Sequence, residues 1–254
     1  MAAQDKSLIE IFEVISNDGS KSVDLVRGVD SFSYFENVLS PMLTAKAVIT
    51  NTGNTIEDED GEISSIYNGL PLNGGEKVNI KIPSTGTGPD LEFTQKNGNE
   101  LYVSSITNVF IDAERETFVL NLVSREAITN ETQRVGSKFP SSQKISDSVK
   151  DIVKSSLLSE KDVDVDDTQN PYGFYGNMKK PFYLLTWLAS KSVPAKVGGK
   201  SATAGYFFFE TKDGYHFRSI DSLISSEPYD IEYTYSPGIV DNQDPYKDFK
   251  ILDF

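Results

Sequence analysis

Alternation of apolar and polar positions predicts a series of β-strands in the first half of the chain. The clearest case is Glu76 to Ile82, in which Val78, Ile80 and Ile82 share one face. Turn-rich segments separate the candidates, so the pattern favours an antiparallel barrel or sandwich over residues 1–124. The other strand candidates are residues 7–16, 22–27, 42–50, 91–93, 101–111 and 117–124.

The period of the pattern changes after Ser124. A helical stripe over residues 146–158 is formed by Ile145, Val149, Ile152, Val153 and Leu157. Ser146 is the predicted N-cap of this helix. A second helix is predicted from Pro181 to Ser192, since proline is pre-organised for the first helical turn. The fold class is therefore mainly β with a helical insert (α+β).

An aromatic hairpin is predicted between residues 206 and 219, because Asp213-Gly214 lies between two apolar runs. A loop of two or four residues would place Phe208, Glu210, Phe217 and Ser219 on one face and Phe207, Phe209, His216 and Arg218 on the other. Each phenylalanine left in water would lose about 1.5–3 kcal/mol of burial. One face can close a barrel core, and the other needs a cover.

Two covers remain open for that second face: the helix that starts at Pro181, or another chain. In the second case the interface residues are those of the second face, and two tyrosines of an alternating segment at 229–235 are weaker candidates. The predicted interface residues are Phe207, Phe209, His216, Arg218, Tyr233 and Tyr235.

Charge and composition narrow the possible functions. The net charge of the 254 residues is −14, which argues against a basic nucleic-acid-binding surface but is compatible with a channel through which DNA slides. The chain has no cysteine, which excludes disulfides and thiolate chemistry. We see no signal peptide and no run of about 18 apolar residues, so we expect synthesis in a cytoplasm.

Candidate catalytic and metal-binding residues are few. His216 is the only histidine, and a packing or surface role fits its place between Tyr215 and Phe217 better than a catalytic triad. The acidic run 57–62 is best explained as a solvated loop. Asp162, Asp164 and Asp166 would share one face of a strand, where they could hold a cation or guard a sheet edge with charge. We predict no catalytic residue, no cofactor and no assigned metal site, and hence no enzyme.

Two segments resemble the baseplate hub subunit of contractile-tailed phages (myoviruses). In residues 117–153 a strand ends in Ser-Arg-Glu, and the motifs Asn-Glu-x-x-Arg-Val and Ile-Ser-Asp-x-Val-x-x-Ile follow. In the second segment, PFYLLTWLASKSVP precedes GYFFFETKDGYHFRSIDSL. The turn Asn73-Gly74-Gly75-Glu76 also fits, and the pieces cover roughly half of the chain in the right order.

The resemblance implies tandem barrels, similar to tail-tube barrels, joined by helices. It divides the chain into a first barrel (1–124), a helical linking domain (125–203) and the start of an incomplete second barrel (204–254). Such hubs are homotrimers whose paired barrels present a pseudo-sixfold ring to the tail tube or tube-initiator protein. The type VI secretion spike protein is similar in architecture.

The same resemblance implies the partners and the location. The central spike protein binds the other side of the ring, and baseplate wedge proteins surround it. The tape measure passes through the lumen, and DNA does so only as cargo. The expected location is the tail baseplate of the virion, after synthesis in the host bacterial cytoplasm.

Two alternatives stay open. A tail-tube or tube-initiator protein would share the barrel but form a hexameric ring. A tail-associated cell-wall hydrolase or carbohydrate-binding module would need a carboxylate pair or an exposed aromatic platform. The lone Trp187 lies in a helical stripe that we expect to be buried, which argues against a tryptophan platform.

Overall fold

The computed structural model describes most of the chain and confirms the predicted fold class, mainly β with a helical insert. Four short strand segments, 56–57, 63–64, 232–235 and 248–251, are described by their backbone alone. The described residues are 8–51, 56–57, 63–64, 66, 70, 72–84, 89–112, 115–195, 205–227, 232–235 and 248–251.

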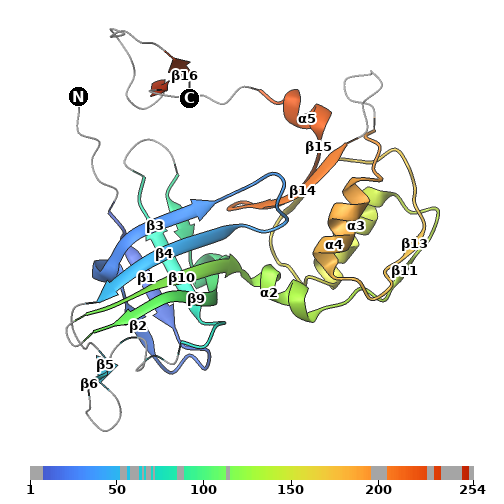
Figure 1. Ribbon diagram of the computed structural model, residues 1–254. Coiled ribbons are helices and arrows are strands. Elements are labelled where there is room, and N and C mark those ends of the chain that lie inside the picture. Colours follow the sequence, from blue (N-terminus) through green and yellow to red (C-terminus); the bar gives the residue numbers. More distant parts are fainter. Residues whose placement is uncertain are drawn as a thin grey trace.

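The first half of the chain forms an eight-stranded antiparallel sheet that curls into a half-barrel (Figure 1). The strand order is β2-β1-β7-β9-β10-β4-β3, and β8 pairs with β7. Two 3-10 helices, η1 (Val26–Gly28) and η2 (Gln95–Asn97), and a short strand pair, β5 (Ile56–Glu57) with β6 (Ile63–Ser64), complete this lobe. The strands of the sheet are β1 (Ile11–Ile15), β2 (Ser22–Asp24), β3 (Val29–Phe35), β4 (Thr44–Asn51), β7 (Lys77–Ile82), β8 (Leu91–Phe93), β9 (Leu101–Ile111) and β10 (Glu116–Ser124).

The alternating pattern explains how this sheet buries one face. In β7, Val78 and Ile80 are fully buried whereas their neighbours Lys77 and Asn79 are partly exposed. The same alternation recurs in β10, where burial of every second residue builds the lining of the half-barrel. The resulting core includes Phe12, Val14, Ala47, Ile49, Phe118, Leu120 and Leu122.

The second lobe combines helices with a small sheet. The strand β12 (Val163–Val165) pairs in parallel with β15 (Gly214–Ser219), which pairs antiparallel with β14 (Tyr206–Thr211). The strands β11 (Lys138–Phe139) and β13 (Phe174–Tyr175) form a separate ribbon, and β16 (Glu232–Tyr235) pairs with β17 (Asp248–Ile251). The helices are α2 (Arg125–Thr132), α3 (Ile145–Ser155), α4 (Pro181–Ala189) and α5 (Ile220–Ile224).

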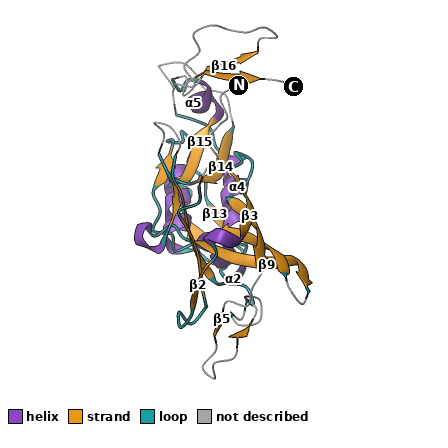
Figure 2. Ribbon diagram, turned by 90° about the vertical axis from the view of Figure 1, so that its left-hand side faces the viewer, coloured by secondary structure: helices purple, strands orange, loops and turns teal. Residues whose placement is uncertain are grey.

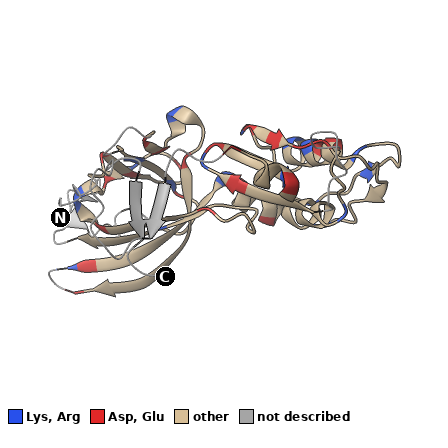
Figure 3. Ribbon diagram, turned by 90° about the horizontal axis from the view of Figure 1, so that it is seen from above, with Lys and Arg blue, Asp and Glu red and all other residues tan. Residues whose placement is uncertain are grey.

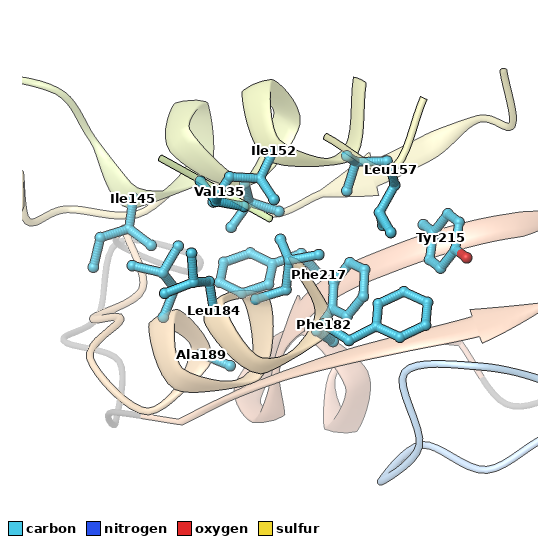
Figure 4. Packing of buried hydrophobic residues seen from close by; sticks show 14 of the residues in the cluster. Val135, Ile145, Ile152, Leu157, Phe182, Leu184, Ala189, Tyr215 and Phe217 are labelled. Carbon is cyan, nitrogen blue, oxygen red and sulfur yellow. The ribbon is translucent and has the colours of Figure 1, made fainter. Parts of the chain in front are cut away.

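The predicted helical stripe is confirmed, since all five of its side chains are 0% exposed. Figure 4 shows Ile145, Ile152 and Leu157 facing Leu184 and Phe182 of α4. The predicted N-cap is wrong. Lys144 has extended backbone angles and precedes the first helical residue, Ile145. Ser146 lies inside the helix, where the Thr168 hydroxyl accepts its backbone N–H at 3.1 Å.

Two separate hydrophobic cores mark the two lobes, which lie next to each other in Figures 1 and 3. Figure 2 shows the molecule from the side of the half-barrel, so the strands of the half-barrel lie in front of the helices. The β14–β15 hairpin shares the core of the helices. The three predicted domains and their boundaries stay a prediction, because much of 204–254 lies outside the described residues. Within the part of the chain that the structure describes, no helix is both long and apolar enough to cross a bilayer.

Candidate assembly surface

The β14–β15 hairpin has a two-residue loop, Lys212-Asp213, since Thr211 pairs with Gly214. This register confirms the predicted division of side chains between the two faces. Gly214 has a φ of +134°, and a Cβ atom there would lie 2.4 Å from the carbonyl oxygen of Asp162. A glycine is therefore required both by the turn and by the close approach of β12.

The inner face of the hairpin carries Tyr206, Phe208, Tyr215 and Phe217, all buried. Phe208 stacks on Tyr215 with ring centroids 5.3 Å apart, and Phe182 of α4 lies 6.3 Å from both rings. The helix that begins at Pro181 therefore covers this face. The prediction that this face closes a barrel core is wrong, because β14 and β15 belong to a three-stranded sheet that packs on helices.

The outer face carries the four hairpin residues predicted at an interface, and all four are partly exposed. The His216 ring stacks on Phe209 at 4.9 Å, and its Nε2 lies 2.9 Å from the Thr211 hydroxyl. Phe207 is paired in register with Arg218. Of the packing and surface roles that the sequence left open for His216, the stacked ring at a partly exposed position combines both. The interface role of this face stays a prediction.

Arg218 forms ion pairs with two carboxylates, Asp164 in β12 and Asp166 directly after it. Its Nη1 donates to Asp164 at 2.7 Å, and its Nε lies 3.2 Å from Asp166. Burial lowers the pKa of Arg218, but the two carboxylates outweigh that effect and raise it. Of the two alternatives, an edge strand guarded by charge fits these contacts. Among the described residues no group of three or more acidic or histidine side chains is arranged to hold a metal ion.

Two other sequence predictions cannot be followed at the side-chain level. Tyr233 and Tyr235 lie in β16, which pairs in parallel with β17, but their side chains are outside the description. Most of the acidic run 57–62 also falls outside the described residues.

A buried ion-pair cluster joins the two lobes, and sequence reasoning missed it. Glu210 is 0% exposed, and its Oε1 accepts from Lys161 Nζ at 2.6 Å. Its Oε2 accepts from the backbone N–H of Leu43 at 3.0 Å and from the Ser124 hydroxyl at 2.8 Å. Glu126 lies 2.9 Å from the same lysine nitrogen. Sheet residues and the helical lobe therefore meet at one carboxylate.

The pKa values of this cluster follow from burial and charge. Burial raises the pKa of Glu210, since it disfavours the charged form. Burial also acts on Glu126, but Lys161 and the Ser159 hydroxyl outweigh it and lower the pKa of Glu126. The two carboxylates together raise the pKa of Lys161 against its burial. The charged form of Lys161 is therefore favoured by the two acidic side chains that flank it.

A second contact between the lobes surrounds the hairpin loop. The backbone N–H of Lys212 donates to Glu36 at 2.6 Å. Glu36 lies in a segment whose large apolar side chains, Phe35, Val38 and Leu39, are exposed. Exposed apolar side chains of this size are typical of surfaces that contact other molecules.

Two solved structures share this fold. The 43 kDa tail protein of prophage MuSo2 from Shewanella oneidensis superimposes with a TM-score of 0.55 at 12% identity, over 92% of this chain and 60% of that one. The tail protein from Neisseria meningitidis MC58 superimposes with a TM-score of 0.53 at 12% identity, over 91% of this chain and 56% of that one. This chain therefore spans 60% or less of the length of both proteins. No protein-family model and no curated protein matches the sequence.

Proposed function

We propose that this chain is a structural, non-enzymatic subunit of a phage tail, and more specifically a baseplate hub subunit. In this role three copies form a ring between the threefold central spike and the sixfold tail tube. The ring lumen passes the tape measure and the DNA. The location is then the tail baseplate of the virion.

The observation that carries the proposal is the shared fold with two tail proteins over nine-tenths of this chain. The motifs of residues 117–153 and of the hairpin point to the hub among tail proteins. The partly exposed outer face of the hairpin supports an assembly role, since a phenylalanine left in water loses burial energy.

The size of the interface limits what the hairpin can do alone. Obligate subunit interfaces bury about 2,000–5,000 Å² in total. The outer face can supply only part of that area. Exposed apolar side chains elsewhere on the half-barrel, including Val109, Phe110 and Ile111 at the end of β9, are available for the rest.

Light scattering on the purified chain over a concentration series tests the proposal. We expect a trimer whose mass is constant at high concentration. A hexamer would contradict the hub and support a tail-tube or tube-initiator protein. A chain that stays monomeric at every concentration would contradict ring formation by this chain.

A second measurement tests the tail function itself. Negative-stain images of the trimer mixed with purified tail tubes should show the ring at one end of the tube. The negative control is a sample of the chain that has been denatured and has not regained the mass of the trimer. Rings that never bind a tube end would contradict the adaptor role even if the trimer forms.

A further inference from the structure

Charge is unevenly distributed along this acidic chain. Residues 133–146 and 168–209 carry eight Lys or Arg and no Asp or Glu. With −14 for the whole chain and +8 for these two segments, the remaining residues carry −22. The two basic segments meet in the fold, because β11 of the first pairs with β13 of the second.

The meeting point lies at the end of the helical lobe away from the half-barrel (Figure 1). It exposes three large apolar side chains: Tyr175 at 59%, Met178 at 64% and Tyr183 at 55%. Lys138 lies over the Tyr175 ring and Lys179 over the Tyr183 ring, each at 5.4 Å from the centroid. We call Lys138, Tyr175, Met178, Lys179 and Tyr183 the basic tip.

The two lysines of the basic tip are available to an acidic partner. Their contacts in the described part of the chain are with aromatic rings, and no ion pair of either is seen there. Their neighbours differ: Lys180 binds Glu131, and Lys144 lies 3.5 Å from Asp167. A cation held over a ring keeps its charge directed outward and gains when a partner excludes water.

The backbone of the basic tip is held in an uncommon conformation. Asn177 and Met178 both have positive φ, at 49° and 55°. The turn is fixed by hydrogen bonds from Met178 N to Val135 O and from Gly176 N to Ser137 O. Left-handed residues other than glycine carry strain that a surrounding structure must hold, and they gather at binding sites.

A hollow of about 210 Å³ lies beside this turn. Its lining includes Tyr175, Tyr183 and Trp187. Trp187, which the sequence placed in a buried stripe, is partly exposed and packs edge-on against Tyr172 and Phe174. A side chain from a partner can enter this hollow while carboxylates reach the two lysines.

We infer that the basic tip docks on a second copy of this chain, on acidic side chains that lie outside the two basic segments of that copy. The charge complementarity is supplied by the chain itself, since everything outside the two basic segments carries −22. Opposite charges steer the encounter and fix its orientation. Because the tip and the acidic residues are different surfaces, the contact is heterologous, and a heterologous contact builds a ring where its rotation closes on itself, as the proposed trimer requires.

This inference rests on the proposed ring-forming function and names the surface that joins neighbouring copies. The test compares the wild type with Lys138→Glu/Lys179→Glu and with Tyr175→Ser/Tyr183→Ser. The matched control is Lys150→Glu/Lys154→Glu, which changes the net charge equally at exposed sites on α3. Circular dichroism checks that each variant folds.

We expect each tip variant to raise the concentration at half-assembly by about tenfold or more, and the control to change it by less than about twofold. Raising the salt from about 0.05 to 0.5 M should weaken wild-type assembly as well. Carbodiimide cross-linking of mixed isotope-labelled chains should join Lys138 or Lys179 to an acidic residue of the other copy.

The outcomes separate this inference from the proposed function. A trimer that is weakened equally by tip and control variants, with no mixed-label cross-link at either lysine, overturns the inference and leaves the hub proposal intact. A hexamer that depends on the tip supports the inference and contradicts the hub. A wild-type chain that stays monomeric overturns both.

Discussion

Lys161 Nζ lies 2.6 Å from Oε1 of Glu210, and the other oxygen of the same carboxylate accepts the backbone N–H of Leu43. These contacts connect three separate parts of the chain: the loop before β4, the turn after α3 and the aromatic hairpin. The relative position of the two lobes therefore depends on a buried charge cluster as well as on apolar packing. Removal of one partner leaves the other desolvated, which costs more than loss of an exposed pair.

Glu210→Gln should destabilise the protein by about 3 kcal/mol, at the low end for a broken buried pair because Glu126 still faces Lys161. Urea unfolding followed by circular dichroism measures the change. The control is Glu131→Gln, which removes an exposed pair with Lys180 and should cost less than about 1 kcal/mol. Equal losses in the two variants would mean that Glu210 does not hold the lobes together.

Glu126 should make stability depend on pH in a defined direction. Its pKa in the folded protein lies below the ordinary value of 4.5, so its stabilisation is complete above that value and is lost as the pH falls through the lower folded pKa. The free-energy gap between wild type and Glu126→Gln should therefore be widest above about pH 5 and shrink below 4.5. Unfolding curves from about pH 3 to 7 measure it.

The partner of Glu126 provides the control for this pH effect. In a Lys161→Met background the loss of stability caused by Glu126→Gln should no longer grow as the pH rises, since the lysine that lowers the carboxyl pKa is gone. A gap that persists unchanged in that background would assign the effect to a different group.

The two faces of β14 should respond differently to substitution. Phe208→Ala removes a buried ring that contacts Phe182 and should cost about 3–5 kcal/mol of stability. Phe209→Ser on the outer face should cost less and should instead weaken trimer formation. Unfolding and light scattering on the same two variants measure both effects. Intact assembly by a folded Phe209→Ser variant would exclude this position from the interface.

Gly214→Ala should disrupt the contact between the hairpin and β12. The added Cβ atom would meet the Asp162 carbonyl oxygen at 2.4 Å, in addition to the strain of a φ of +134°. Gly98→Ala is the matched control, because its φ is +68° and nothing lies within 4 Å of the added atom. We expect the first variant to lose clearly more than the roughly 1 kcal/mol expected of the second. Equal losses would show that β12 can move away.

Local patterns predicted much of the fold. The alternation in β7, the helical stripe of α3 and the Asp-Gly turn each depend on near neighbours in the chain, and the structure contains all three elements. The order of the strands in the half-barrel could not be predicted from the sequence. Alternation identifies the buried face of a strand, but it does not identify which strand lies next to it.

The candidate site was predictable only in part. The division of the hairpin faces followed from the loop length, but the parallel pairing of β12 with β15 joins segments about fifty residues apart and leaves no local pattern. Glu210 offered one signal, since it is the one acid on the hairpin face that carries Tyr206, Phe208, Tyr215 and Phe217. That signal indicates a buried partner without identifying Lys161. The Ser146 N-cap failed because Thr168, distant in the chain, supplies the hydrogen bond instead.

The Leu43–Glu210 hydrogen bond joins residues 167 positions apart, which has a consequence for the order of events during translation. The half-barrel strands leave the ribosome well before Glu210 does, and domains generally fold as they emerge. The hydrogen bond between Leu43 and Glu210, which joins the two lobes, can form only after the hairpin has been synthesised. The hairpin is thus among the last described elements to be synthesised. The outer face of the hairpin therefore forms only after all strands of the half-barrel have left the ribosome.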